Sequence, residues 1–306
     1  MITGGIDELY KILLIVFYGL NYDPSLVVKI SRTEESASQL NMESNVLKTI
    51  NEKYKNIEGI PRILFSNHTT DAHVNVQTVI NGALLASVLN KDSFPELARL
   101  TTLWLVELAK STKTRPPEDW REKMVHSVLS DINSSAAKII DSHFMDQTIH
   151  ILGDFNIPCL VCEHRDFGPQ NILVDSESKL GVIDWEFSRL HGIPALDLIF
   201  FLTRAGFILR GAPKSITYGD CYREMLDPDT FTGGVFRDCL DYYTSALDIP
   251  GSEIPSLRLM TWIVHYFWRM FGDKRYTPEP GHRESSINHW TLTLWKEELS
   301  ISGLSE

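Results

Sequence analysis

The sequence is poor in the features that mark nucleic-acid-binding, membrane and secreted proteins. Its 29 lysines and arginines face 40 aspartates and glutamates, and the net charge of −11 disfavours a nucleic-acid partner. The longest apolar run, residues 12–20, is too short to span a bilayer. No basic leader precedes that run, so we expect no secretory signal and no membrane attachment.

Cysteine is scarce as well. The four cysteines are Cys159, Cys162, Cys221 and Cys239. The first two are spaced as C-x-x-C, but they lie in an apolar run, and no second close pair completes a zinc site. Buried thiols in a reducing compartment are the favoured interpretation, so we expect a cytoplasmic protein.

What is present is typical of a globular protein. The 306 residues are 43% hydrophobic and 23% charged, which leaves room for one large or two modest domains. Between residues 216 and 253, eight carboxylates face only two arginines. This stretch would attract a cationic substrate, although a solvated acidic surface is the simpler interpretation for most of it.

The order of the predicted elements divides the chain in two. Residues 1–80 are rich in strands, which we expect over residues 9–20, 26–30, 63–65 and 74–80, with one helix over residues 34–50. The remainder is mostly helical, with helices expected over residues 95–110, 120–144, 195–209, 235–247, 254–271 and 287–299. We therefore predict an N-terminal lobe of residues 1–80, a break at Asn81-Gly82, and a C-terminal lobe of residues 81–306.

The most informative stretch runs from Glu163 to Asp175 and continues from Gly181 to Ser188. It contains Asp166, Asn171 and Asp184 in the order that phosphoryl transfer from ATP requires. One carboxylate can orient a substrate hydroxyl and accept its proton. An amide and a second carboxylate can hold Mg²⁺ against the phosphates.

The same stretch predicts a β-hairpin, because two β-prone runs flank the polar turn of residues 175–179. A turn centred after Glu177 would place Asn171 directly opposite Asp184, and residue 173 opposite residue 182. Directly opposed side chains lie on one face about 5 Å apart, so we expect these two to share one cation. An ordinary surface hairpin is the alternative, but it does not account for Asp166 in the preceding loop.

A second pair of residues lies in the N-terminal part. Glu43 interrupts the apolar stripe of the predicted helix 34–50, and Lys29 interrupts the apolar strand 26–30 in the same way. A lysine paired with a helical glutamate is how kinases present an ammonium group to the α- and β-phosphates. Two solvated residues at element edges are the alternative, which the downstream motif disfavours.

Together these residues resemble the aminoglycoside phosphotransferase and choline kinase superfamily over about residues 4–270. The resemblance implies an α+β, protein-kinase-like two-lobed fold, with a small antiparallel β-sheet lobe carrying one helix and a larger, mainly helical lobe. It implies ATP and Mg²⁺ as cofactors. By position, Asp166 resembles the catalytic base, Asn171 and Asp184 the metal ligands, Lys29 the phosphate-binding lysine and Glu43 its partner.

Three further positions follow from the resemblance. Residues 79–82 resemble the hinge, where Ile80 and Gly82 would contact the adenine through their backbone. His164 matches a structural residue near the catalytic loop, although its neighbours alone also suit a core histidine. Asp197 matches a buried brace for that loop, and from its position alone it is equally a carboxylate at a helix N-terminus.

The chain departs from the family pattern in two places. Its loop reads His-Arg-Asp where the family commonly has His-Gly-Asp, and the nucleotide-covering loop holds only Gly4 and Gly5. Asp184 is followed by Trp-Glu, which is normal for the small-molecule branch. Only thirteen positions separate Asp184 from Asp197, too few for the peptide-docking segment of a protein kinase.

The sequence thus predicts an ATP- and Mg²⁺-dependent kinase that phosphorylates a hydroxyl of an aminoglycoside-, amino-alcohol- or sugar-like molecule. The alternative is a nucleotide-binding pseudokinase or regulatory module, which the sparse glycine loop suggests. Aromatic residues of the C-terminal half could bind a cationic acceptor by cation–π contacts, or could form the core of packed helices. They are Trp262, His265, Tyr266, Trp268, Trp290 and Trp295.

Overall fold

The computed structural model describes residues 11–19, 23–54, 57–69, 72–136, 140–271 and 289–301. Contacts group the chain into two compact units, the first formed by residues 1–88 with 162–190 and the second by residues 89–161 with 191–306. The catalytic loop and the hairpin therefore group with the N-terminal residues. The predicted division into lobes of residues 1–80 and 81–306 instead assigns the catalytic loop and hairpin to the C-terminal lobe. That predicted division stays a prediction.

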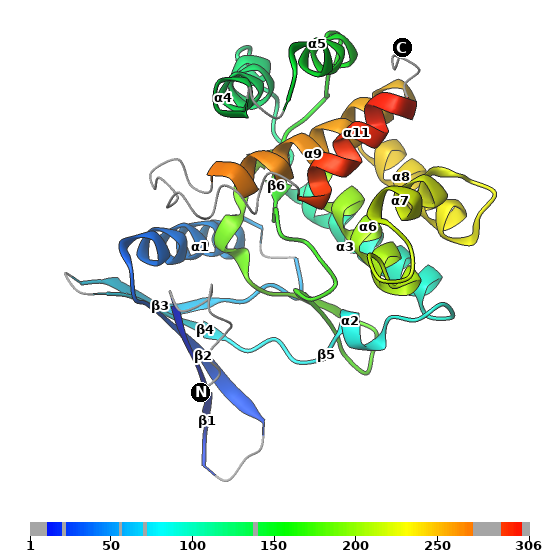
Figure 1. Ribbon diagram of the computed structural model, residues 1–306. Coiled ribbons are helices and arrows are strands. Elements are labelled where there is room, and N and C mark those ends of the chain that lie inside the picture. The colour runs from blue at the N-terminus through cyan, green and yellow to red at the C-terminus, as the bar shows by residue number, and fades with distance from the viewer. Residues whose placement is uncertain are drawn as a thin grey trace. The chain divides into compact units, whose positions relative to one another are not determined.

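The first unit contains an antiparallel four-stranded sheet of order β1-β2-β4-β3 (Figure 1). Its strands are β1 (Lys11–Phe17), β2 (Pro24–Ser31), β3 (Ile63–His68) and β4 (His73–Thr78). Helix α1 (Glu34–Lys53) lies along one face of this sheet. Its first turn is closed by a capping box between Thr33 and Ser36, and the predicted apolar stripe is buried. The predicted strands and helix are thus confirmed where the structure describes them.

The rest of the first unit surrounds the catalytic loop. A three-stranded sheet of order β5-β7-β8 is formed by β5 (Ala83–Leu84), β7 (Ile172–Val174) and β8 (Leu180–Val182). Helix α2 (Leu85–Val88) follows β5, and the 3₁₀ turn η3 (Trp185–Phe187) follows β8. The chain passes between the two units within β6 (Val161–Glu163) and β9 (Arg189–Gly192), which form a two-stranded sheet.

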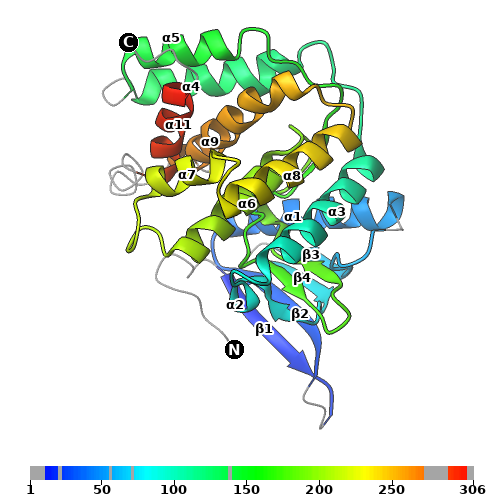
Figure 2. The ribbon, with the colours of Figure 1, turned by 90° about the vertical axis from the view of Figure 1, so that its right-hand side faces the viewer.

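The second unit is mostly helical (Figure 2). Its elements are α3 (Phe94–Thr112), η2 (Glu122–His126), α4 (Ser127–Ala136), α5 (Ser142–Ile151), α6 (Leu196–Arg210), α7 (Tyr218–Leu226), α8 (Phe231–Ala246), η4 (Gly251–Glu253), α9 (Ile254–Phe271) and α11 (Trp290–Ile301). Helix α11 packs on α9 and α7, and α3 packs on α8. The largest buried side chains of this unit include Trp262, Tyr222 and Trp295.

One helix prediction in this unit was only partly right, and one helix was not predicted. The expected helix over residues 120–144 is helical from residue 120 through η2 and α4 to Ala136, but α5 is a separate helix that begins at Ser142. Asp141 starts α5 as its N-cap, because its side chain accepts a hydrogen bond from the Phe144 N–H at 2.8 Å. Helix α7 was missed because its nine residues carry only a short apolar stripe.

The predicted burial of the cysteine thiols is confirmed. All four are buried and none forms a disulfide. Across the described parts of the chain, no group of three or more metal-binding His, Cys, Asp or Glu side chains occurs. None of the helices described is both long and apolar enough to cross a membrane.

Candidate active site

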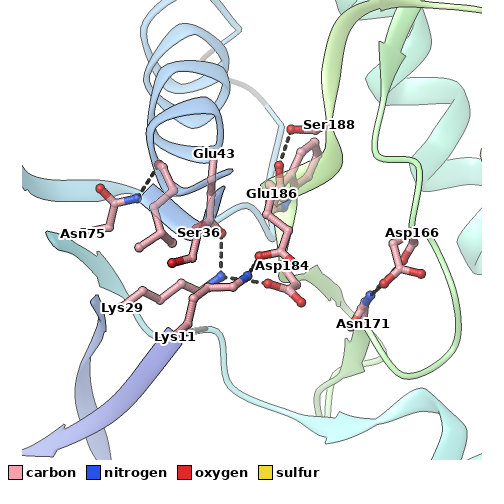
Figure 3. Close-up of polar contacts among 12 residues, drawn as sticks. Lys11, Lys29, Ser36, Glu43, Asn75, Asp166, Asn171, Asp184, Glu186 and Ser188 are labelled. Atoms are coloured by element: carbon pink, nitrogen blue, oxygen red, sulfur yellow. Dashed lines mark hydrogen bonds and ion pairs between the residues drawn. The ribbon is translucent and has the colours of Figure 1, made fainter. Parts of the chain in front are cut away.

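Lys29 is the centre of a charged cluster in the first unit (Figure 3). It lies on β2, opposite Leu13 of β1 and Asn75 of β4, and it is buried. Its Nζ donates hydrogen bonds to Glu43 Oε1 at 2.7 Å and to Asp184 Oδ1 at 2.9 Å. The predicted pairing of Lys29 with Glu43 is confirmed, and Asp184 joins the same ammonium group from a position far along the chain.

Lys29 and Asp184 hold each other in their charged forms. Burial alone would lower the pKa of Lys29, but Asp184 and Glu43 outweigh it and raise that pKa above its ordinary value. Burial alone would raise the pKa of Asp184, but Lys29 and then Lys11 lower it to about 2. At neutral pH Lys29 is therefore an ammonium ion beside the Asp184 carboxylate, and the Asp184 side chain is still 38% exposed.

The predicted hairpin forms, but its register was wrong by one residue. Ile172 pairs with Val182 and Leu173 with Gly181, so Asn171 lies opposite Ile183 and not opposite Asp184. The turn is asymmetric: the Asp175 N–H donates to the Lys179 carbonyl, and Ser178 has a left-handed φ of 62°. The loop between the paired residues 175 and 179 thus has three residues, whereas a turn centred after Glu177 was predicted. This difference shifts the strand pairing by one residue.

Asp184 lies outside the hydrogen-bonded ladder of the hairpin. It follows β8 with a left-handed φ of 68°, and the turn η3 begins at the next residue. Its carboxylate is thus aimed at Lys29 by the backbone turn rather than by strand pairing. The expected juxtaposition with Asn171 through directly opposed strands does not occur.

Asp166 and Asn171 contact each other within the catalytic loop (Figure 3). The Asn171 amide nitrogen Nδ2 donates to Asp166 Oδ2 at 2.7 Å and to the Asp166 carbonyl at 2.8 Å. The Gly168 N–H also donates to the Asp166 carbonyl at 2.8 Å. This compact turn orients the carboxylate and leaves it only partly buried.

His164 ties the loop to the hairpin. The ring is buried, its Nε2 donates to the Ile183 carbonyl at 2.9 Å, and its Nδ1 accepts from the Asp166 N–H at 3.3 Å. Burial lowers its pKa to about 4, so it is neutral near pH 7. One ring nitrogen donates and the other accepts, which is the arrangement of a neutral imidazole.

Arg165 occupies the position where the resembled family commonly has glycine. Its φ is 73°, in the left-handed region that glycine adopts at little cost and other residues do not. Its Nε donates to Glu163 Oε2 at 3.2 Å, and both side chains are buried.

The predicted hinge packs closely on the hairpin. Gly82 has a φ of 142°, and a Cβ there would lie 2.8 Å from the Val174 carbonyl oxygen. Gly181 lies under Ile80, whose Cγ2 would be 2.0 Å from an added Cβ. Gly59, which the sequence analysis missed, approaches Leu180 in the same way, and its carbonyl accepts from the Val182 N–H at 2.8 Å.

Lys11 and Glu186 were also missed. They form an ion pair at the edge of the Lys29 cluster. The sequence did carry a signal, because Lys11 opens an apolar strand and Glu186 lies two residues after Asp184. Gly4 and Gly5 lie outside the residues that the structure describes.

In the second unit, the surface interpretation of the acidic stretch holds for several residues. Asp220 pairs with Arg223, Glu224 with Arg210 and Asp238 with Arg237, all on the surface or partly buried. Asp197 is buried in the first turn of α6. Its role as a brace stays a prediction.

The aromatic residues divide into core and partly exposed groups. Trp262, Tyr266 and Trp295 are fully buried, as the packed-helix alternative expects. The ring of Trp290 is half-buried, and the Arg204 guanidinium lies 5.5 Å from its centroid. A cation of the protein itself therefore already occupies one face of Trp290.

Comparison with known proteins shows what the segment around the catalytic loop is similar to. Residues 156–223 match the family model of the phosphotransferase enzyme family, and this segment contains Asp166, Asn171 and Asp184. This segment of the chain is therefore similar to phosphotransferases. The comparison with curated proteins finds no match.

Similar solved structures show the fold of the chain. A macrolide 2'-phosphotransferase type I is 13% identical with a TM-score of 0.56, covering 90% of this chain and 89% of its own. The GDP and kanamycin complex of APH(2")-IIia is 13% identical with a TM-score of 0.54, covering 94% and 93%. A ternary complex of APH(4)-Ia with ADP and hygromycin B is 10% identical with a TM-score of 0.54, covering 93% of each. The predicted α+β, protein-kinase-like fold is confirmed.

The residues of the first unit fit a Mg²⁺ ion by the chemistry of their donors. Asp184 remains ionised, and only its Oδ1 is engaged by Lys29. The Asn171 side-chain nitrogen donates both of its hydrogen bonds to Asp166. Its amide oxygen is the atom of that side chain suited to a cation. Two protein oxygens suffice, because Mg²⁺ retains water and phosphate ligands.

Proposed function

We propose that this protein is a phosphotransferase that transfers the γ-phosphate of ATP, in the presence of Mg²⁺, to a hydroxyl group of a small molecule. The observation that carries this proposal is the position of Lys29 between Glu43 and Asp184, in the same unit as the Asp166–Asn171 pair. A structural ion pair would not require a third, half-exposed carboxylate. A phosphate-binding ammonium beside a metal-binding carboxylate does.

Each residue has one task in this proposal. Lys29 binds the α- and β-phosphates, and Glu43 holds its ammonium group in place. Asp184 and Asn171 would hold Mg²⁺, which supplies charge stabilisation on the phosphates when bound. Asp166 orients the acceptor hydroxyl and takes its proton at a carboxylate oxygen. The backbone of Ile80 and Gly82 would contact the adenine.

The acceptor is proposed at the level of chemical class only. The structural relatives are named as enzymes of aminoglycosides and a macrolide, so an aminoglycoside-, amino-alcohol- or sugar-like hydroxyl is the class to test first. The buried state of Trp262, Tyr266 and Trp295 removes these rings from the candidates for binding a cationic acceptor.

The direct test measures ADP or GDP release with ATP or GTP, Mg²⁺ and a panel of aminoglycosides, macrolides, choline, ethanolamine and monosaccharides. We expect acceptor-dependent turnover that Asp166→Asn lowers by about 10²- to 10⁴-fold. Asp175→Asn, in the hairpin turn, controls for general effects on the fold. Nucleotide binding without turnover on any acceptor would favour the pseudokinase alternative, and undiminished activity of Asp166→Asn would exclude the role of that carboxylate.

A further inference from the structure

A second lysine approaches the proposed nucleotide site from a different strand. Lys11, the first residue of β1, forms an ion pair with Glu186 of η3, and Figure 3 shows both beside Asp184 and Lys29. The Lys11 side chain is 23% exposed and that of Glu186 is 10% exposed. Two charges so little hydrated are coupled more strongly than a surface pair.

The pair changes the charge next to the proposed phosphate site. The ion pairs of this cluster join three carboxylates (Glu43, Asp184 and Glu186) to two lysines (Lys11 and Lys29). Without Lys11, the buried carboxylate of Glu186 would be uncompensated beside Asp184. That carboxylate would repel nucleotide phosphates and would be costly to bury.

The pair also holds the turn that aims Asp184. The left-handed backbone of Asp184 is unfavourable for a residue with a side chain, and it persists only where its surroundings determine it. On one side, Trp185 is fully buried and its Nε1 donates to the Val182 carbonyl at 2.9 Å. On the other side, Glu186 links the turn to β1 through Lys11. The direction of Asp184 thus depends on both anchors.

We propose that Lys11 is a positioning residue of the nucleotide–metal site, which acts through Glu186 to hold η3 and so to aim Asp184. It does not need to touch the nucleotide to do this. The inference rests on the proposed function, because it gives Lys11 a task only if Asp184 serves a metal–nucleotide complex.

The test uses the full chain and measures how nucleotide affinity depends on Mg²⁺, by calorimetric titration with ATP, with no acceptor present. The variants are Lys11→Met, which retains most of the apolar stem, Glu186→Gln and the double variant. We expect Lys11→Met to raise the Mg²⁺ concentration for half-maximal binding by about ten-fold. The double variant should be no worse than Lys11→Met alone, because the two residues act as one unit. Lys179→Met, which removes an exposed ion pair with Glu177 in the same unit, is the matched control and should match the wild type.

The possible results separate the two proposals. If Lys11→Met lowers only the melting temperature and leaves the Mg²⁺ dependence unchanged, the contact is merely structural and this inference is overturned. Single-variant effects that add in the double variant overturn it as well. Wild-type protein that binds no nucleotide with or without Mg²⁺ overturns the proposed function itself, and this inference with it.

Discussion

The molecule contains two charged networks that differ in how completely they are closed. In the first unit, Lys29 joins Glu43 to the 38%-exposed Asp184, and Glu43 Oε2 has no hydrogen-bond partner. In the second unit, Arg258 donates to Glu298 from two nitrogens, at 2.9 and 3.1 Å, and Glu298 is 1% exposed.

The Arg258–Glu298 network, called the closed network here because its carboxylate is buried and fully engaged, also includes hydrogen bonds donated by aromatic side chains. The Tyr222 hydroxyl donates to Glu298 Oε1, and the Trp262 Nε1 donates to the Tyr222 oxygen at 2.9 Å. Both carboxylate oxygens of Glu298 are therefore engaged, and the network ties α7, α9 and α11 together. The comparison teaches that a network built for structure engages its carboxylate oxygens internally, whereas the Lys29 network keeps one carboxylate, Asp184, partly exposed where a ligand can reach it.

The largest effect is expected from a variant in the Lys29–Glu43–Asp184 network, called the open network here because Asp184 is partly exposed. The variant should abolish the proposed metal ligand without unfolding the protein. Asp184→Asn should lower kcat by at least about 10²- to 10³-fold, because it removes a charge aimed at the phosphates. Its free energy of unfolding should change by less than about 2 kcal/mol, because Lys29 keeps Glu43. Turnover assays and urea unfolding test this, with Glu177→Gln in the hairpin turn as control. Activity within ten-fold of the wild type would contradict it.

The closed network should respond in the opposite way. Glu298→Ala leaves the Arg258 guanidinium buried without its carboxylate, which should lower the free energy of unfolding by about 3–5 kcal/mol. Nucleotide affinity of the folded variant should equal that of the wild type. Glu96→Ala, which removes an exposed carboxylate from Arg99, is the control and should leave stability unchanged. A loss of nucleotide binding in folded Glu298→Ala would show that the two networks are coupled.

A third prediction uses the pH dependence of His164. The unfolded chain takes up a proton near the ordinary pKa of 6.5, whereas the buried ring has a pKa of about 4. The stability from the neutral ring is therefore complete above pH 6.5 and is lost as the pH falls toward 4, by roughly 3 kcal/mol. Urea unfolding across this range measures it. His164→Gln should flatten the slope, and the exposed His150→Gln should not; equal slopes in all three proteins would exclude this source.

The smallest expected effect concerns the backbone next to the open network. Gly82→Ala places a Cβ against the Val174 carbonyl at a φ unsuited to alanine, which should cost about 1–3 kcal/mol. The predicted hinge should shift with it and weaken nucleotide binding. Gly251→Ala, where an added Cβ meets nothing within 4 Å, is the control. Unfolding curves and nucleotide titration together test this. If Gly82→Ala has the stability and the nucleotide affinity of the wild type, the close approach to Val174 does not constrain the hinge.

Local sequence patterns were sufficient for much of the open network. Lys29 and Glu43 each interrupt an apolar pattern, and a buried charge needs a partner, so their pairing could be predicted. The register of the hairpin could not, because it depends on the left-handed conformation of Ser178, which no pattern in the turn specifies. The link between Lys29 and Asp184 was missed because it depends on the left-handed backbone of Asp184 itself, which no local pattern specifies either.

The sequence by itself determined the types and order of the groups near Asp166, the helix and strand periodicity around Lys29, and the resemblance to phosphotransferases. Only the tertiary structure decided which of these groups meet. Asp184 reaches Lys29 through a backbone turn, Lys11 reaches Glu186 across the unit, and Arg258 reaches Glu298 forty residues along the chain. Periodicity reports which face of an element is apolar, but a contact between distant polar side chains depends on how whole elements pack, which no local pattern encodes.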